Sequence, residues 1–150
     1  MDMKLGIPFV AAVFSSLLLS TCSQSERQNG AWFSEEARQR GLDFKHKSGY
    51  TDRPMVPEIV GGGAALADVD GDGDLDVYLI QSGRIGSENA MEPNRLYLNR
   101  GDGFFEEATA SVGADNRGYG MGVAAGDYDN DGDVDLYVTN YGPNALLRNT

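Results

Sequence analysis

The chain has 150 residues, of which 23 are acidic and 12 are basic, and its formal net charge is −11 with the single histidine neutral. Such a balance offers no basic surface to a nucleic acid, so we predict no nucleic-acid partner. The single cysteine excludes an intrachain disulfide, so no covalent cross-link within the chain is expected to contribute to stability.

The first 21 residues resemble an export signal. Lys4 precedes an apolar run over 7–19, which is shorter than the roughly 20 residues of a membrane-spanning helix and typical of a signal-peptide core. Cys22 follows and resembles the lipid-attached cysteine of bacterial lipoproteins; the alternative is an ordinary cleaved signal with an incidental cysteine. We expect an exported protein, either secreted or held at the cell envelope as an outer-membrane lipoprotein. It would touch a membrane only through a lipid anchor at Cys22.

The next segments lead into a folded domain predicted over 32–150. Residues 22–31 are polar and poor in apolar side chains, which predicts a flexible tether. The best helix candidate is 34–40, with Ser34 as the cap and a glycine directly after it. The only histidine, His46, has no serine, cysteine or second histidine paired with it in the sequence. We interpret it as structural or exposed rather than catalytic.

Two nine-residue stretches, 68–76 and 127–135, are near copies of each other. Each has aspartate at positions 1, 3, 5, 7 and 9 and glycine at position 6, where the backbone can turn back on itself. So many anions repel one another unless a cation lies among them, and calcium, which takes about 6–8 oxygen ligands, is the simplest occupant. The sequence therefore predicts two Ca²⁺ sites. The candidate ligands are Asp68, Asp70, Asp72, Asp74, Asp76, Asp127, Asp129, Asp131, Asp133 and Asp135.

Alternatives to a calcium loop fit the two acidic stretches less well. An EF-hand needs an acid at position 12 and flanking helices, whereas position 12 is Leu79 in one copy and Val138 in the other. Magnesium demands near-octahedral geometry and retains its waters, which suits crowded carboxylates poorly. The simplest alternative is a pair of solvated acidic turns without metal.

The repeat extends beyond the acidic stretches. Similar flanking segments recur at an offset of 59 residues: 61–67 with 120–126, and 76–80 with 135–139. A further pair, 93–99 and 143–149, is offset by 50 residues, so the first copy carries nine extra residues. A weaker pair begins at Phe33 and Phe105, and each member reaches a glycine eight residues later. A period near 50–60 residues predicts a repeat architecture.

Each repeat unit is predicted to consist of short strands. In the first unit the expected strands are 64–67, 77–80, 96–99 and 104–108. The Arg-Gly-Asp tripeptide at 100–102 is interpreted as part of a hairpin turn rather than as an adhesion motif. Four strands per unit predict an all-β fold built from β-propeller blades. Two blades, the second one truncated, cannot close a ring, so we expect either the N-terminal part of a longer protein or a truncated gene product.

Segment 120–144 resembles the repeat of FG-GAP (VCBS) repeat proteins of the cartilage-acidic-protein-like group, which often carry an ASPIC/UnbV domain. Segments 41–46 and 57–63 resemble the opening of those proteins. The resemblance covers about 32–150. It implies a seven-bladed propeller like the integrin α-subunit head, with calcium loops between paired strands. It also implies side-chain ligands at loop positions 1, 3, 5 and 9 and a backbone carbonyl at position 7, with water completing each shell.

These observations predict an exported calcium-binding β-propeller module that acts as a scaffold for adhesion or for binding an extracellular protein or glycan at the cell envelope. We expect the metal to be structural and the protein not to be an enzyme, since the sequence shows no nucleophile paired with a base. The alternative is the non-catalytic N-terminal part of a larger propeller hydrolase or lyase whose active site lies elsewhere.

Overall fold

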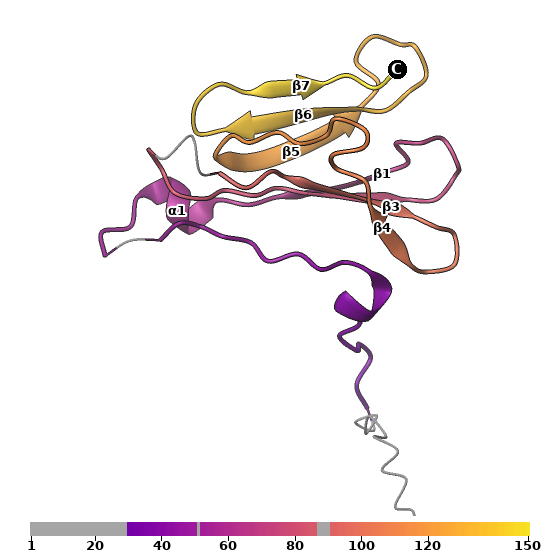
Figure 1. Cartoon of the computed structure of the whole chain (residues 1–150), viewed down its shortest axis with the longest axis horizontal. Coiled ribbons are helices and arrows are strands. Elements are labelled where there is room, and N and C mark those ends of the chain that lie inside the picture. The colour runs from indigo at the N-terminus through magenta and orange to yellow at the C-terminus, as the bar shows by residue number, and fades with distance from the viewer. Residues whose placement is uncertain (1–29, 51, 87–90) are drawn as a thin grey trace, which may run out of the picture. The chain divides into compact units, whose positions relative to one another are not determined.

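The computed structural model describes residues 30–50, 52–86 and 91–150 (Figure 1). The fold lies in a compact unit, Glu35–Thr150, and a separate unit, Met1–Ser34, is described only over its last five residues. The predicted export signal, the lipidation at Cys22 and most of the tether over 22–31 lie outside the described residues. None of the helices in the described part of the chain has the length and apolarity needed to cross a membrane.

The described residues contain seven strands, which form two antiparallel sheets (Figure 1). The first sheet has the order β1-β2-β3-β4, with bounds Ala64–Ala67, Asp76–Leu79, Arg95–Asn99 and Phe105–Glu107. The second sheet has the order β5-β6-β7, with bounds Gly120–Gly126, Asp135–Asn140 and Ala145–Leu147. The prediction of an all-β fold built from blade-like sheets is confirmed, and the described residues form no closed ring.

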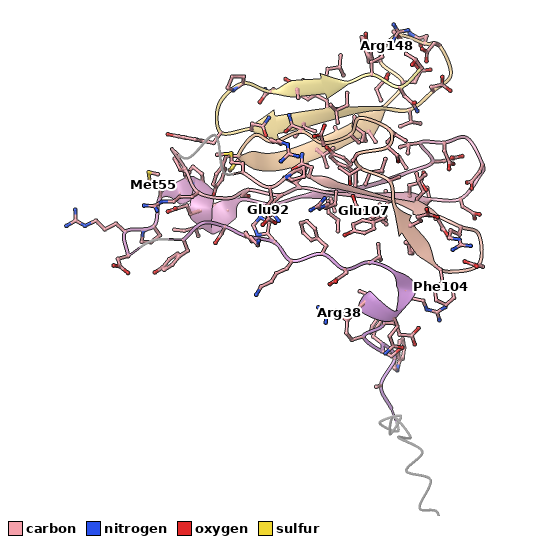
Figure 2. All side chains as sticks on the ribbon, in the orientation of Figure 1. Arg38, Met55, Glu92, Phe104, Glu107 and Arg148 are labelled. Atoms are coloured by element: carbon pink, nitrogen blue, oxygen red, sulfur yellow. The ribbon has the colours of Figure 1, made fainter. Side chains whose placement is uncertain are left out.

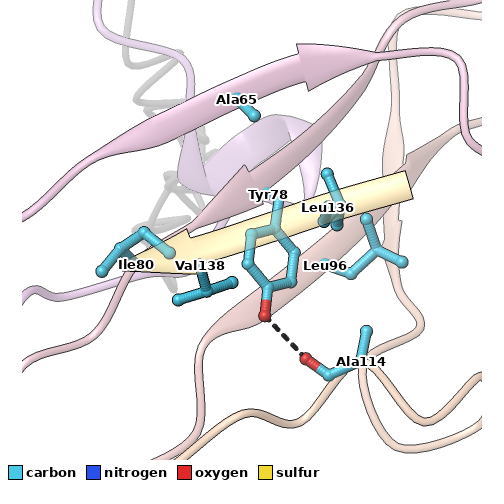
Figure 3. Close-up of a cluster of buried hydrophobic side chains, with 7 residues drawn as sticks. All are labelled: Ala65, Tyr78, Ile80, Leu96, Ala114, Leu136 and Val138. Atoms are coloured by element: carbon cyan, nitrogen blue, oxygen red, sulfur yellow. Dashed lines mark hydrogen bonds between the residues drawn. The ribbon is translucent and has the colours of Figure 1, made fainter. Parts of the chain in front are cut away.

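The main hydrophobic core lies between the two sheets (Figure 3). Alternation along each strand sends every second side chain to the same face. One face of the first sheet contributes Ala65, Tyr78, Ile80 and Leu96, and β6 contributes Leu136 and Val138. The Tyr78 hydroxyl donates a hydrogen bond of 2.9 Å to the carbonyl oxygen of Ala114, in the connection between the sheets. The core therefore joins the two repeat units.

Repeat-related residues of the two sheets differ sharply in exposure. Tyr78 is 1% exposed, whereas its counterpart Tyr137 is 45% exposed. Likewise, Leu96 is 3% exposed and its counterpart Leu146 is 45% exposed. The second sheet thus covers one face of the first sheet, while the equivalent face of the second sheet is open to solvent. Such front-to-back stacking of repeated sheets is how successive propeller blades pack.

Asparagine side chains form the same hydrogen bonds in both repeats. Asn94 accepts the backbone N–H of Gln81 (2.8 Å) through Oδ1 and donates to the Tyr78 hydroxyl (3.2 Å) through Nδ2. In the second unit, Asn144 accepts the backbone N–H of Asn140 (3.0 Å) and donates to the Tyr137 hydroxyl (2.9 Å). Each asparagine fixes the end of the second strand of its sheet, so the two copies share hydrogen bonds as well as sequence.

The helix predicted over 34–40 is wrong. The structure has only a 3₁₀ turn, η1 (Arg38–Arg40), which begins after Ala37 rather than at a Ser34 cap. Glu35 accepts the backbone N–H of Ala37 (2.9 Å), and such a local side-chain bond competes with helix formation. Gly41, with φ of +93°, ends the turn, and a Cβ there would lie 2.1 Å from the carbonyl oxygen of Phe105.

The weaker repeat that begins at Phe33 and Phe105 corresponds to two similar turns, one after η1 and one after β4. After η1 the Leu42 N–H donates to the Ala37 carbonyl (2.8 Å). Seventy-two residues later, the Ala114 N–H donates to the Thr109 carbonyl (2.9 Å). Each bond spans five residues and encloses a glycine of positive φ. The shared sequence pattern therefore encodes a glycine-terminated turn, not a helix of two turns.

The segment 43–48 is attached to the sheets through its backbone. Its carbonyl groups accept hydrogen bonds from Tyr97 Oη, Gln81 Nε2 and Tyr119 Oη at 3.1 Å each. A short helix, α1 (Val56–Val60), follows and was not predicted. Glu58, in the first turn of α1, accepts the backbone N–H of the N-cap residue Met55 (2.7 Å), as the acidic residue of a capping box does.

Candidate metal centre

Each acidic loop connects the first two strands of its sheet. Residues 68–75 lie between β1 and β2, and residues 127–134 lie between β5 and β6. The aspartate at position 1 folds the loop back on itself. In the first loop, the Asp68 carboxylate accepts hydrogen bonds from the backbone N–H groups of Gly71 (2.8 Å) and Gly73 (2.9 Å).

The second loop has nearly the same backbone. Asp127 accepts hydrogen bonds from the N–H groups of Asp131 (3.2 Å) and Gly132 (3.0 Å). Gly132, at position 6, has φ of +101°, as the turn there requires. Position 4 also has positive φ in both loops, +76° at Gly71 and +60° at Asn130. This second turn residue was not predicted, although glycine and asparagine are the two residues that tolerate this conformation best.

The aspartate at position 9 is buried and braces the loop. Asp76 is 1% exposed, and its carboxylate accepts the backbone N–H groups of Val69 (2.9 Å) and Asn99 (2.8 Å). It therefore joins the start of the loop to the end of β3. Asp135, also 1% exposed, accepts the N–H groups of Tyr128 (3.0 Å) and Asn149 (2.8 Å).

Two asparagines support these loops and were missed as functional residues. Asn99 Nδ2 donates to the carbonyl oxygen of Leu75 (3.3 Å). Asn149 Nδ2 makes the matching bond to Val134 (3.3 Å) and a second one to Val69 (2.6 Å), which links the second sheet to the first loop. Their sequence signal was the shared asparagine at the end of segments 93–99 and 143–149.

Three of the five aspartates in each loop converge on one point. The first group has carboxylate oxygens within 4.8 Å of one another and consists of Asp68, Asp70 and Asp76. The second group meets the same limit and consists of Asp127, Asp129 and Asp135. The candidate ligands at positions 5 and 7 are not part of these groups; they are Asp72, Asp74, Asp131 and Asp133. Their part in binding a metal stays a prediction.

The spacing of these carboxylates fits calcium. Two oxygens bound to one calcium ion lie at most about 5 Å apart, because each is about 2.3–2.6 Å from the ion. The donors are all hard oxygens, which calcium prefers. Leu79 lies in β2 and Val138 lies in β6, so both loops run into strands rather than into the helices of an EF-hand.

The electrostatic environment of the two loops is not the same. In the first loop, partial desolvation raises the pKa of Asp70, with further contributions from repulsion by Asp76, Asp72 and Asp68. In the second loop, the pKa of Asp131 is lowered, first by a hydrogen bond from the backbone of Asp133 and then by a hydrogen bond from Arg148. The first loop thus contains carboxylates that repel one another, whereas a guanidinium offsets this repulsion in the second.

The structure also pairs His46 with a serine, which the sequence did not indicate. His46 Nε2 lies 3.0 Å from Ser82 Oγ, although 36 positions separate the two residues. Ser82 is fully buried, and its hydroxyl donates to the carbonyl oxygen of Gly120 (2.9 Å). A hydroxyl has only one proton, so in the tautomer that keeps the bond to Gly120 the imidazole N–H donates to Ser82. In that tautomer the pair lacks the hydroxyl-to-imidazole hydrogen bond of a nucleophile and its base.

The chain is similar in sequence to known proteins. The chain is 36% identical to human cartilage acidic protein 1 over 107 residues, which is 62% of this chain and 16% of that protein. It is 33% identical over 107 residues to the mouse protein of the same name and 40% identical over 62 residues to that of Xenopus tropicalis. The matched region thus spans about a sixth of the human and mouse proteins. A sequence model described as FG-GAP-like repeat matches residues 68–138. This region, which holds both acidic loops, therefore matches the FG-GAP-like repeat.

Proposed function

We propose that this β-propeller-like module binds two calcium ions, one in each acidic loop, and that the metal has a structural role. The observation that carries the proposal is the convergence of three carboxylates at the same place in both repeats. Asp68, Asp70 and Asp76 would hold one ion, and the corresponding set Asp127, Asp129 and Asp135 would hold the other. Asp72, Asp131 and the residues at position 7 are the candidates for the remaining protein ligands.

Calcium would act on a loop that the protein has already shaped. Asp68 and Asp76 are held by backbone hydrogen bonds, so their oxygens face the same point without large rearrangement. A bound dication supplies positive charge where these carboxylates otherwise repel one another. Because Asp76 also contacts β3 through Asn99, the stabilisation would extend from the loop into the sheet. The expected consequence is a more stable blade rather than a chemical reaction.

Calcium is expected to raise the melting temperature of the purified protein. Extracellular calcium modules bind with dissociation constants of about 10⁻⁴–10⁻³ M, and tenfold saturation adds about 1.4 kcal/mol per site. Two sites would shift melting by on the order of 10 °C for a domain of this size. Differential scanning calorimetry with about 10 mM calcium, and with a chelator, measures this shift.

A matched pair of double variants tests whether the loops are responsible. Asp70→Asn with Asp129→Asn removes one exposed ligand from each loop and should abolish most of the calcium response. Asp102→Asn with Glu106→Gln removes the same amount of charge from exposed positions outside the loops, and this variant should keep the calcium response. A melting curve that does not respond to calcium contradicts the proposal. An equal response to magnesium contradicts the choice of metal.

The wider role is proposed on the same basis. We infer that the protein is exported and that its open sheet surfaces serve adhesion, with a protein or glycan as the partner. Support comes from the predicted signal sequence and from the similarity to proteins named for cartilage. If the loops bind calcium as weakly as other extracellular modules do, the calcium concentration outside the cell would be needed to fill them. We also propose that it is not an enzyme, since the Ser82 hydroxyl beside His46 is fully buried and bonded to the carbonyl oxygen of Gly120. Fractionation of expressing cells would show the chain outside the cytoplasm, and a purely cytoplasmic chain would contradict export.

A further inference from the structure

The two acidic loops are near copies, but the residue that lies beside each loop at the end of the third strand differs between them. In the alignment of 93–99 with 143–149, Leu98 corresponds to Arg148. Leu98 lies in β3 and packs against the hydrophobic core. Arg148 directly follows β7, and Figure 2 shows its side chain beside the second loop. The position directly before the loop-supporting asparagine is therefore apolar in one repeat and permanently positive in the other.

Arg148 contacts the second loop through two of its nitrogens. Its Nε lies 2.8 Å from Asp129 Oδ2, and its Nη2 lies 3.2 Å from Asp131 Oδ2. Asp129 is one of the three converging carboxylates, and Asp131 is a predicted ligand at position 5. The guanidinium thus already neutralises part of the charge that a bound calcium ion would neutralise.

We propose that Arg148 is an internal cation of the second loop that competes with calcium, so that the first loop fills before the second. This inference rests on the proposed calcium binding. For calcium to draw fully on Asp129, the ion pair with Arg148 must weaken or break, and the free energy of that step reduces the affinity. The first loop has Leu98 at this place and carries no such penalty.

The competition is expected to be moderate. The Arg148 side chain is 51% exposed, so water and salt screen its ion pairs. Breaking exposed ion pairs typically changes an equilibrium constant by about two- to fivefold. The second loop should therefore bind calcium about two- to fivefold more weakly than the first. It should also keep its shape better when calcium is absent, because Arg148 offsets the repulsion there.

Glycine amide resonances can follow the two loops separately in the purified protein. Gly73 donates to Asp68 and Gly132 donates to Asp127, so each amide reports on the carboxylate at position 1 of its own loop. In two-dimensional NMR with added calcium chloride, Gly73 should reach half-shift at a lower concentration than Gly132. Arg148→Leu, which copies the first loop, should lower the dissociation constant of the second loop by about two- to fivefold and leave Gly73 unaffected.

The reciprocal and neutral variants complete the test. Leu98→Arg places a cation beside the first loop and should weaken calcium binding at Gly73. Leu98→Arg also removes a contact with the hydrophobic core, so a variant confined to the surface is needed as well. Arg148→Gln is that variant, and it should strengthen calcium binding by the second loop as Arg148→Leu does. Higher sodium chloride should reduce the difference between the wild-type loops.

The possible failures are distinguishable. If both amides respond to calcium but the two arginine variants leave the second loop unchanged, this inference is wrong and the calcium proposal stands. If the arginine variants bind calcium more weakly, Arg148 orients Asp129 for the metal instead of competing with it, and the inference is again overturned. If neither amide responds, the calcium proposal itself has failed.

Discussion

Replacing Tyr78 with alanine is expected to lower the free energy of unfolding by about 3–5 kcal/mol, as for other large aromatic side chains removed from a core. Tyr78 is 1% exposed and lies among Leu96, Leu136 and Val138, between the two sheets (Figure 3). Its removal leaves a cavity where the repeat units meet. Urea denaturation of the variant and the wild type in calcium-free buffer measures the difference.

The Tyr78 hydroxyl contributes separately from the ring. It donates to Ala114 and accepts from Asn94, so Tyr78→Phe should cost about 1–2 kcal/mol through the two buried partners it leaves. Burial, opposed by the bond from Asn94 and aided by Asp115, raises the pKa of Tyr78 to about 12. The stability that comes from keeping the Tyr78 hydroxyl protonated is fully present below the unfolded-state pKa of 10.0, and it is lost as the pH rises through about 12.

The second repeat supplies the control for this prediction. Tyr137 occupies the same place in its sheet as Tyr78 but is 45% exposed, so Tyr137→Ala should cost less than about 1 kcal/mol. If the two alanine variants lost equal stability, the exposed face of β6 and β7 would have to be covered in solution. Front-to-back stacking of the two sheets would then be an incomplete account of the fold.

Much of the fold was predictable because strands and turns are local features. The segment 64–67 was expected as a strand and is β1, and the strands on either side of each acidic loop follow from short apolar runs next to glycine-rich turns. The Arg-Gly-Asp tripeptide at 100–102 lies in the turn between β3 and β4, as expected, where Asp102 accepts the N–H of Phe104 (3.0 Å). In these segments the local preference and the tertiary structure agree.

The prediction of a helix over 34–40 failed because a capping residue, acidic residues and a final glycine are also typical of a tight turn. The length of such an element depends on what it contacts. Here Arg40 lies over the ring of Phe104, 5.1 Å from its centroid, and Gly41 meets the backbone of Phe105, so the turn is fixed by the β3–β4 hairpin. Those contacts join segments that are far apart in the chain and leave no local trace in the sequence.

Parts of the candidate site could not be predicted for the same reason. The ten aspartates were evident from their spacing, but the spacing did not show that only positions 1, 3 and 9 converge. Nor did it show that Asp76 is buried against the N–H group of Asn99, 23 residues away. Arg148 was aligned with Leu98 in the repeat, yet its charge matters only because the end of β7 lies beside the second loop.

The second large effect is expected at Asp76, where structural and metal-binding roles can be separated. Asp76→Ala removes the acceptor of two backbone N–H groups, on Val69 and Asn99, at a site that is 1% exposed. Each buried donor left without a partner costs about 1–3 kcal/mol, so the variant should lose about 2–6 kcal/mol even with a chelator present. Denaturant unfolding with chelator measures this calcium-independent part.

Asp70→Ala is the matched variant for the metal-binding role. Asp70 is exposed and, within the described residues, accepts a single long hydrogen bond, from the N–H of Asp72 at 3.3 Å. Its loss should therefore change the free energy of unfolding of the chelated protein by less than about 1 kcal/mol. Both variants should lose the calcium response of the first loop, but only Asp76→Ala should be strongly destabilised without calcium. If Asp76→Ala were destabilised only when calcium is present, the buried carboxylate would be a ligand and not a brace. The prediction that the sheet holds the loop in place before the metal arrives would then be wrong.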